Sequence, residues 1–110
     1  NLLNDLPIQF QKIDQNSFTA YHLFVIKIDF KKVKKNYNQI FNYLLKNKIL
    51  VNKHYPCVHL QPYYKSLGFK KGILPNAEEY EKSAISLPLS TKMSVKDIKI
   101  VSNVLRKALI

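Results

Sequence analysis

The sequence predicts a small two-layer α/β (α+β) domain in which about three strands are packed by helices. Its length of 110 residues allows one domain with one modest core. Residues 18–28 are rich in aromatic and β-branched side chains, which is typical of a strand. Residues 33–45 and 95–109 carry apolar side chains at helical spacing, which predicts two amphipathic helices.

The first half of the chain is expected to form a lead-in, a central strand and a helix. Residues 1–17 are weakly patterned, which predicts an irregular or short extended segment. The strand over residues 18–28 is apolar on both faces, so we expect it at the centre of the sheet with both faces covered. Asp29 is expected to cap the helix that follows, and Asn47 to end it in a left-handed conformation.

The second half is expected to add two strands. Residues 49–55 are predicted as the second strand and residues 85–87 as the third. Prolines interrupt the pattern between them, with a short helical turn near residues 63–67.

Two further helices have recognisable start signals. Asn76, with Glu79 three residues later, resembles a capping box. Ser94 and Asp97 predict the cap of the last helix. The expected order of elements is therefore β-α-β-(α-α)-β-α.

Positive charge dominates the chain, which has 18 Lys and Arg against 7 Asp and Glu, a net charge of +11. Such a charge suggests nucleic acid or an acidic membrane surface as a partner. Arginine is the residue best suited to reading bases and clamping phosphates, however, and Arg106 is the only one. We therefore interpret the charge as a solvated lysine surface, and expect neither a nucleic-acid partner nor a membrane.

The cysteine content and the first residues bear on the cellular context. No apolar run approaches the roughly 18–20 residues of a membrane span, and residues 1–12 lack the basic start and apolar core of a secretory signal. Cys57 is the only cysteine, which excludes an internal disulfide and suits a reducing, cytoplasmic location. Because the first residue is Asn1 rather than Met, we expect a processed or trimmed chain, or a piece of a longer one.

Residues 54–64, HYPCVHLQPYY, hold the densest group of polar and aromatic side chains. His54, Cys57 and His59 are candidate zinc ligands, but a structural zinc needs a fourth ligand and the sequence has no second Cys or His cluster. Cys57 and His59 are also a candidate nucleophile pair, but no glycine-rich turn accompanies them. The missing fourth ligand therefore weakens the zinc interpretation, and the missing glycine-rich turn weakens the nucleophile interpretation.

Two other interpretations of residues 54–64 stay open. Histidine, tyrosine and glutamine side chains supply neutral donors and acceptors for hydroxyls and phosphates, and ring faces for sugars or bases, which favours a substrate-facing loop. The same side chains could equally pack at the rim of the core. His22, inside the predicted strand, is interpreted as a buried, hydrogen-bonded histidine rather than a ligand.

Three motifs occur in order along the chain: TAYHLFVIKID at residues 19–29, VNKHYPCVHLQPYYKSLGF at 51–69, and LPNAEEYEKSAISLPLS at 74–90. From residue 18 to residue 109 the chain resembles the C-terminal part of the DegT/DnrJ/EryC1/StrS sugar aminotransferases, which use pyridoxal phosphate (PLP) and have the fold type I architecture. Within that family it is most similar to the branch that aminates the 4-keto group of a UDP-linked 6-deoxy-N-acetyl sugar on the way to pseudaminic acid. The spore-coat polysaccharide aminotransferases share the same likeness.

The resemblance implies a single small C-terminal domain over residues 18–110, with a mainly antiparallel sheet, preceded by a lead-in over residues 1–17. It also implies a missing large domain, which carries the lysine that binds PLP covalently, the aspartate that pairs with its pyridine nitrogen, and most phosphate contacts. This chain alone is therefore expected neither to hold PLP nor to transfer an amino group, so no catalytic, cofactor-binding or metal-binding residue is assigned to it. In the complete enzyme we expect a nucleotide-sugar substrate and a homo-oligomer.

The resemblance assigns one set of residues to the substrate side of the cleft: His54, Tyr55, His59, Gln61 and Tyr64. The chain departs from the family pattern next to this set. The family usually reads H-Y-x-P-V-H, whereas Pro56 stands one place earlier here and Cys57 follows it. A glycine that is usual before the second strand is replaced by Lys48.

Two alternatives without enzymatic activity stay open. A basic nucleic-acid-binding module is suggested by the charge and by the lysines near Tyr37, Phe41 and Tyr43. A self-associating module is suggested because a small domain separated from a large one would expose apolar surface.

Overall fold

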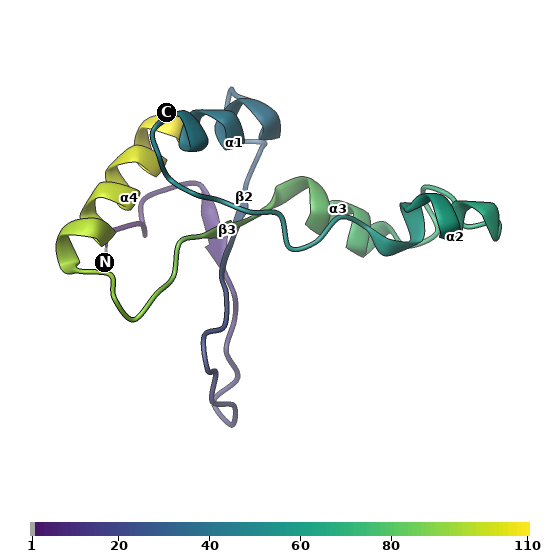
Figure 1. The fold of residues 1–110 in the computed structure, drawn as a ribbon, viewed down its shortest axis with the longest axis horizontal. Helices are drawn as coiled ribbons and strands as arrows, with labels where there is room; N and C mark the ends of the chain where they lie inside the picture. The colour runs from purple at the N-terminus through teal and green to yellow at the C-terminus, as the bar shows by residue number, and fades with distance from the viewer. Residues whose placement is uncertain (1) are drawn as a thin grey trace.

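The structure is a computed structural model that describes residues 2–110. Three strands and four α-helices follow one another along these residues, with a short 3-10 turn between the first two helices (Figure 1). In chain order they are β1 (Ile8–Phe10), β2 (Phe24–Ile28), α1 (Tyr37–Lys46), the turn η1 (Val58–Leu60), α2 (Pro62–Ser66), α3 (Pro75–Ser83), β3 (Ala84–Leu87) and α4 (Val95–Leu109).

The sheet is antiparallel with the order β1-β2-β3, which confirms the predicted α/β class, the predicted three-stranded sheet and the central position of β2. Ile26 of β2 stands opposite Phe10 of β1 on one side and Ile85 of β3 on the other. The central strand is shorter than predicted, because only Phe24–Ile28 pair. Tyr21 takes a left-handed φ of 48°, which interrupts extended backbone before the strand starts.

Two predicted boundaries in the first half are wrong. Helix α1 is capped by Asn36 instead of Asp29, through a capping box with Gln39. Asp29 instead accepts a hydrogen bond from the Lys31 amide in the preceding turn. The left-handed residue after the helix is Lys48, with φ 62°, and not Asn47.

The predicted second strand over residues 49–55 is also wrong. Only Asn52 pairs, in an isolated antiparallel bridge to Ser86 with amide-to-carbonyl distances of 2.9 and 3.1 Å. The outer partner of β2 is β1, from the segment expected to be a lead-in. Helix α3 begins at Pro75, which suits the first helical position because proline has no amide hydrogen to leave unpaired, so Leu74 and not Asn76 is the cap residue.

The cap predicted for the last helix is confirmed: the Ser94 hydroxyl accepts from the Asp97 amide at 3.2 Å, and Asp97 Oδ2 accepts from the Ser94 amide at 2.8 Å. We expect Ser94→Ala to lower the free energy of unfolding by about 1 kcal/mol, because one amide of the first turn loses its acceptor. Urea titration followed by circular dichroism would measure the change. Ser94→Thr keeps a hydroxyl and should retain most of the stability; equal losses in both variants would contradict the capping role.

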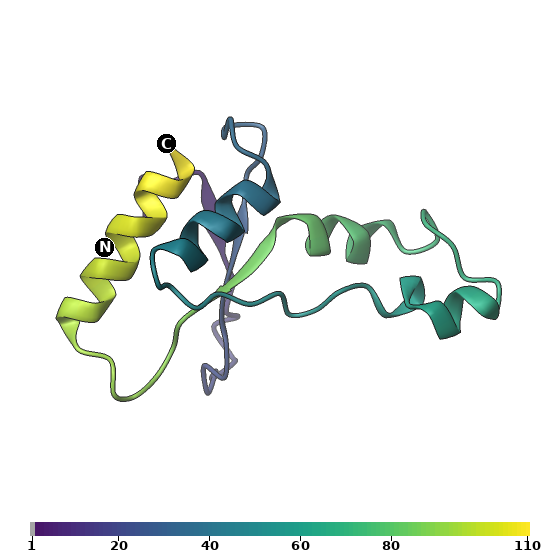
Figure 2. The ribbon, with the colours of Figure 1, turned by 45° about the horizontal axis from the view of Figure 1, so that its top comes forward.

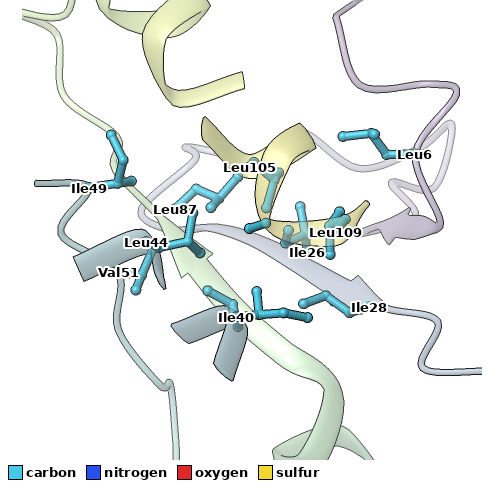
Figure 3. Packing of buried hydrophobic residues seen from close by; sticks show 12 residues of the cluster. Leu6, Ile26, Ile28, Ile40, Leu44, Ile49, Val51, Leu87, Leu105 and Leu109 are labelled. Atoms are coloured by element: carbon cyan, nitrogen blue, oxygen red, sulfur yellow. The ribbon is translucent and has the colours of Figure 1, made fainter. Parts of the chain in front are cut away.

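The core lies between the sheet and the two long helices, α1 and α4 (Figures 2 and 3). Ile26, Ile40, Leu44, Ile85 and Leu105 are completely buried there. The opposite face of β2 is covered only in part, because Val25 and Lys27 stay half-exposed. The prediction that both faces of the strand are covered therefore holds for one face alone.

A long projection leaves this core, which we call the arm and define as residues 53–83. It contains η1, α2 and α3 and extends away from the sheet in both views (Figures 1 and 2). The radius of gyration is 15.6 Å, whereas a compact domain of this length would have about 13 Å. The main hydrophobic cluster contains residues up to Val51 and again from Ile85, but none from the arm. No helix within residues 2–110 has both the length and the apolar character needed to cross a membrane.

Candidate functional site

The site predicted from the sequence lies where the arm leaves the sheet. The outgoing segment of the arm, residues 53–61, runs beside helix α3, which returns to β3 (Figure 2). Because the main apolar core stops short of the arm, polar contacts between these two segments hold it together. Two carboxylates of α3 supply most of them, and we call Glu78, Glu81, His59, Cys57 and Lys53 the carboxylate cluster.

His59 and Glu78 form the buried half of the cluster. Their side chains are 5% and 8% exposed, and His59 Nε2 lies 3.1 Å from Glu78 Oε1. The same oxygen accepts the Gly72 amide at 2.6 Å. The hydrogen bond from His59, followed by that from Gly72, holds the pKa of Glu78 below its usual value. Since Glu78 accepts, Nε2 of His59 carries a hydrogen and donates.

Glu81 forms the other half of the cluster, one helical turn further along α3. Its Oε2 accepts the backbone amide of Cys57 at 3.1 Å, and its Oε1 lies 3.5 Å from the Lys53 ammonium. Lys53 also sits over the Tyr37 ring, 4.6 Å from the ring centre, which connects the arm to α1. Hydrogen bonding to Cys57, with a smaller contribution from Lys53, lowers the pKa of Glu81.

Cys57 is unsuited to act as a nucleophile. Burial, followed by the neighbouring Glu81 carboxylate, raises the pKa of its thiol to about 11. His59, its candidate base, bonds to Glu78 instead. Metal binding finds no support either, because no three His, Cys, Asp or Glu side chains of residues 2–110 lie close enough together to hold an ion.

The residues assigned to the substrate side fall into two groups. Three of them bond within the protein: His59 to Glu78, His54 Nδ1 to the Ser86 hydroxyl at 2.7 Å, and Gln61 Nε2 to the Cys57 carbonyl at 3.4 Å. Ser86 is a buried residue of β3, so His54 ties the base of the arm to the sheet.

The two tyrosines of the set present ring surface to solvent. Tyr55 is 64% exposed and meets the His54 ring edge-on, with 4.7 Å between ring centres. Tyr64 is 37% exposed and lies between Tyr63 and Phe69 in two edge-on contacts. The structure thus brings His54 and Tyr55 together at the base of the arm and places Tyr64 of α2 in an aromatic group with Tyr63 and Phe69.

Sequence reasoning missed Glu78 and Glu81 as partners of this segment. Their spacing of three residues puts both carboxylates on one helical face, which was a usable signal. The partners are 19 and 24 residues away in sequence, at His59 and Cys57, so the pairing itself could be seen only in the fold.

The carboxylate cluster does not fit PLP. Covalent attachment needs a free lysine amine, but Lys53 is engaged by Glu81 and Tyr37. A phosphate group needs free backbone amides, but the amides of Gly72 and Cys57 already donate to carboxylates.

Comparison with known proteins identifies the family that this chain matches. A family model described as the DegT/DnrJ/EryC1/StrS aminotransferase family matches residues 1–106. The spore coat polysaccharide biosynthesis protein SpsC of Bacillus subtilis is 36% identical over 89 residues, which are 79% of this chain and 23% of SpsC. Protein MJ1066 of Methanocaldococcus jannaschii is 37% identical over 89 residues, 80% of this chain and 23% of that protein.

Solved structures of aminotransferases superpose on this chain. The PMP-form of the putative sugar aminotransferase Spr1654 from Streptococcus pneumoniae superposes with a TM-score of 0.81 at 26% identity, over 98% of this chain and 28% of that one. PseC of Helicobacter pylori, an aminotransferase involved in the biosynthesis of pseudoaminic acid, gives a TM-score of 0.82 at 23% identity over 98% of this chain and 29% of PseC, which shows a shared fold. The chain spans about a quarter of the length of these relatives.

Proposed function

Because the chain belongs to the DegT/DnrJ/EryC1/StrS aminotransferase family, we propose that it is the carboxy-terminal domain of a PLP-dependent sugar aminotransferase. Its proposed substrate is a UDP-linked 4-keto-6-deoxy amino sugar destined for a cell-surface polysaccharide. The family match over residues 1–106 carries the proposal. The roles of SpsC in spore coat polysaccharide biosynthesis and of PseC in pseudoaminic acid biosynthesis support the class of substrate.

The chain by itself is proposed to be inactive. It spans about a quarter of its relatives, and its carboxylate cluster offers no free lysine amine or phosphate-binding amide. PLP, when bound by the rest of the enzyme, supplies the electron sink for amino transfer. The proposal includes a homo-oligomeric enzyme in the reducing cytoplasm, in keeping with Cys57 as the single cysteine.

The role proposed for this domain is to orient the nucleotide sugar. Tyr55 and Tyr64 offer exposed ring faces of the kind that stack on sugars and bases. His54 is held by Ser86, and its ring supports that of Tyr55. His59 and Gln61 act one step further back, because His59 bonds to Glu78 of α3 and Gln61 to the Cys57 carbonyl. A fixed orientation of the substrate lowers the entropic part of the barrier to transfer.

A fusion protein tests the function. The part of SpsC that precedes its matched region is joined to Asn1 of this chain, to give a polypeptide of family length. With glutamate, PLP and UDP-linked 4-keto-6-deoxy-N-acetylhexosamine, we expect the fusion to form amino sugar and the free chain to form none, as measured by mass spectrometry. Product from the free chain would contradict its inactivity. A fusion that works with dTDP- or GDP-linked sugars but not with the UDP sugar would contradict the substrate class.

Tyr55→Ala tests the proposed ring contact within the same fusion. A lost aromatic contact of about 0.5–1.5 kcal/mol corresponds to a KM about two- to tenfold higher, with a smaller change in kcat. Leu50→Ala removes a side chain that is 79% exposed and lies outside the arm, so it should leave KM unchanged. Equal values of KM for the two variants would remove Tyr55 from the substrate side.

A further inference from the structure

The arm needs something other than the apolar core to set its direction. The main hydrophobic cluster stops at Val51 and resumes at Ile85, on either side of the arm. Two contacts attach the base of the arm to β3, and both converge on Ser86: the backbone bridge from Asn52 and the hydrogen bond with His54 Nδ1 at 2.7 Å. Contacts that converge on one residue act as a hinge, so they fix the root of the arm but not the angle at which it projects.

Lys53 supplies an attachment to a different element. Its ammonium lies 4.6 Å from the centre of the Tyr37 ring on α1 and 3.5 Å from Oε1 of Glu81 on α3. Because Lys53 belongs to the outgoing segment and Glu81 to the returning helix, one ammonium joins both segments of the arm to α1. The side chains of Lys53 and Glu81 are 31% and 24% exposed, so water screens their attraction less than that of a fully exposed pair.

Tyr37 is itself held in place on α1. Its ring stacks on that of Phe41, with 5.8 Å between the ring centres. Its hydroxyl donates to the carbonyl of Ala84 at 3.0 Å, at the point where α3 passes into β3. Burial, followed by the Glu81 carboxylate, raises the pKa of Tyr37 to about 12, so the hydroxyl keeps the proton that it donates near neutral pH. The ring therefore offers Lys53 a fixed face.

We propose that Tyr37, Lys53 and Glu81 form a clasp that sets the angle of the arm and so holds its tyrosines in the orientation that binds the nucleotide sugar. Lys53 lies two residues before Tyr55, so the clasp acts at the root of the proposed ring contact. Lys53 is then a positioning residue, because its ammonium is engaged by Glu81 and Tyr37 and acts through Tyr55. The inference rests on the proposed function for the sugar, whereas the clasp itself can be tested in the free chain.

Distance measurements between two spin labels test the clasp in the free chain. The labels are attached at Asn42→Cys on α1 and at Lys70→Cys between α2 and α3, both exposed positions, in a chain whose buried cysteine is replaced by Cys57→Ala. That replacement keeps the backbone amide that donates to Glu81. We expect a narrow distance distribution in this labelled chain and a several-fold wider one after Lys53→Ala, because the arm can then turn at its root.

Three further variants make this test decisive. Glu81→Gln removes the ion pair from its other side and should widen the distribution as well, which decides the case if Lys53→Ala fails to fold. Lys53→Arg keeps a cation over the ring and should restore the narrow distribution. Lys32→Ala removes an ion pair of nearly the same length, 3.6 Å to Asp29, outside the arm, and should leave the distribution narrow. A narrow distribution in Glu81→Gln or in folded Lys53→Ala would overturn the proposal, and so would an equal widening in Lys32→Ala.

The SpsC fusion tests the consequence for the substrate. When only a fraction of the molecules holds the arm at the right angle, the apparent dissociation constant rises by the inverse of that fraction. A fall of this fraction to about one third therefore gives Lys53→Ala a KM for the nucleotide sugar that is about threefold higher, whereas kcat stays unchanged because saturating sugar restores the angle. Lys53→Arg should return KM to that of the unmodified fusion, and Lys32→Ala should not change it. A lower kcat with an unchanged KM would overturn the proposal, because Lys53 would then act in the reaction itself or in folding.

The two measurements separate this inference from the proposed function. Wide distributions in the Lys53 and Glu81 variants, together with a fusion that transfers no amino group to any nucleotide sugar, support the clasp and contradict the function. Amino transfer by a fusion whose KM is the same with and without Lys53→Ala supports the function and overturns the role of the clasp in substrate binding.

Discussion

Replacement of Ile26 by alanine is expected to lower the free energy of unfolding by about 2–5 kcal/mol. Ile26 is completely buried at the centre of β2, between Phe10 and Ile85 on the neighbouring strands. The substitution removes apolar contacts and leaves a cavity between the sheet and the two long helices. Small domains have a total stability of about 5–15 kcal/mol, so this one change could remove a large part of it.

Urea denaturation followed by circular dichroism would measure the loss. Ile100→Ala makes the same chemical change at a side chain that is 46% exposed on α4, and its effect should stay within about 0.5 kcal/mol. If the two variants lose the same stability, the centre of the core does not lie at β2.

Acidification is expected to open the arm before the sheet unfolds. The pKa values of Glu78 and Glu81 are both lowered in the folded protein, from an ordinary value of 4.5. A carboxyl with a lowered pKa stabilises the fold at pH values above its unfolded-state pKa, and this contribution is lost as the pH falls through the lowered folded-state value. The partners that face these carboxylates are His59 and the Gly72 amide for Glu78, and Lys53 and Cys57 for Glu81.

Amide hydrogen exchange would detect this local opening. Between pH 7 and about pH 3 we expect protection factors to fall at Gly72 and Cys57, whose amides donate to the two carboxylates, while Ile26 stays protected. Glu78→Gln and Glu81→Gln should lower the protection already at pH 7. Glu79→Gln lies on the same helix, outside the cluster, and should behave as the unmodified chain. Simultaneous loss of protection in the arm and the sheet would contradict a separate opening.

The elements that the sequence predicted best are those with a one-sided apolar pattern. Helix α4 repeats its apolar residues over four turns and carries a capping box, so its start at Ser94 was predicted correctly. Strand β1 has only three residues, which is too short for a recognisable alternation. Ile49 and Val51 are apolar and β-branched, which predicted a strand. Both side chains are buried in the core, but burial alone does not require a backbone pairing partner.

The position of the candidate site along the chain was predictable from the sequence, but the contacts of its side chains were not. The density of His, Tyr and Gln identified residues 54–64. Helix α3 decides which of these side chains face inward, because the buried His59 bonds to Glu78 of that helix. Contacts across 19 and 24 residues of sequence leave no local pattern, so the pairing of Glu78 with His59 and of Glu81 with Cys57 could not be assigned from periodicity.

The bridge between Asn52 and Ser86 has a consequence for how such domains can diversify. The arm leaves and rejoins the sheet at neighbouring, antiparallel positions, and it contributes nothing to the main hydrophobic cluster. A tight turn that joins Asn52 to Ser86, the two bridged residues, could close the same gap, as in a hairpin. Insertions, deletions and exchanges within the arm are therefore compatible with an unchanged scaffold, and one sheet with two helices can carry arms of different length and chemistry.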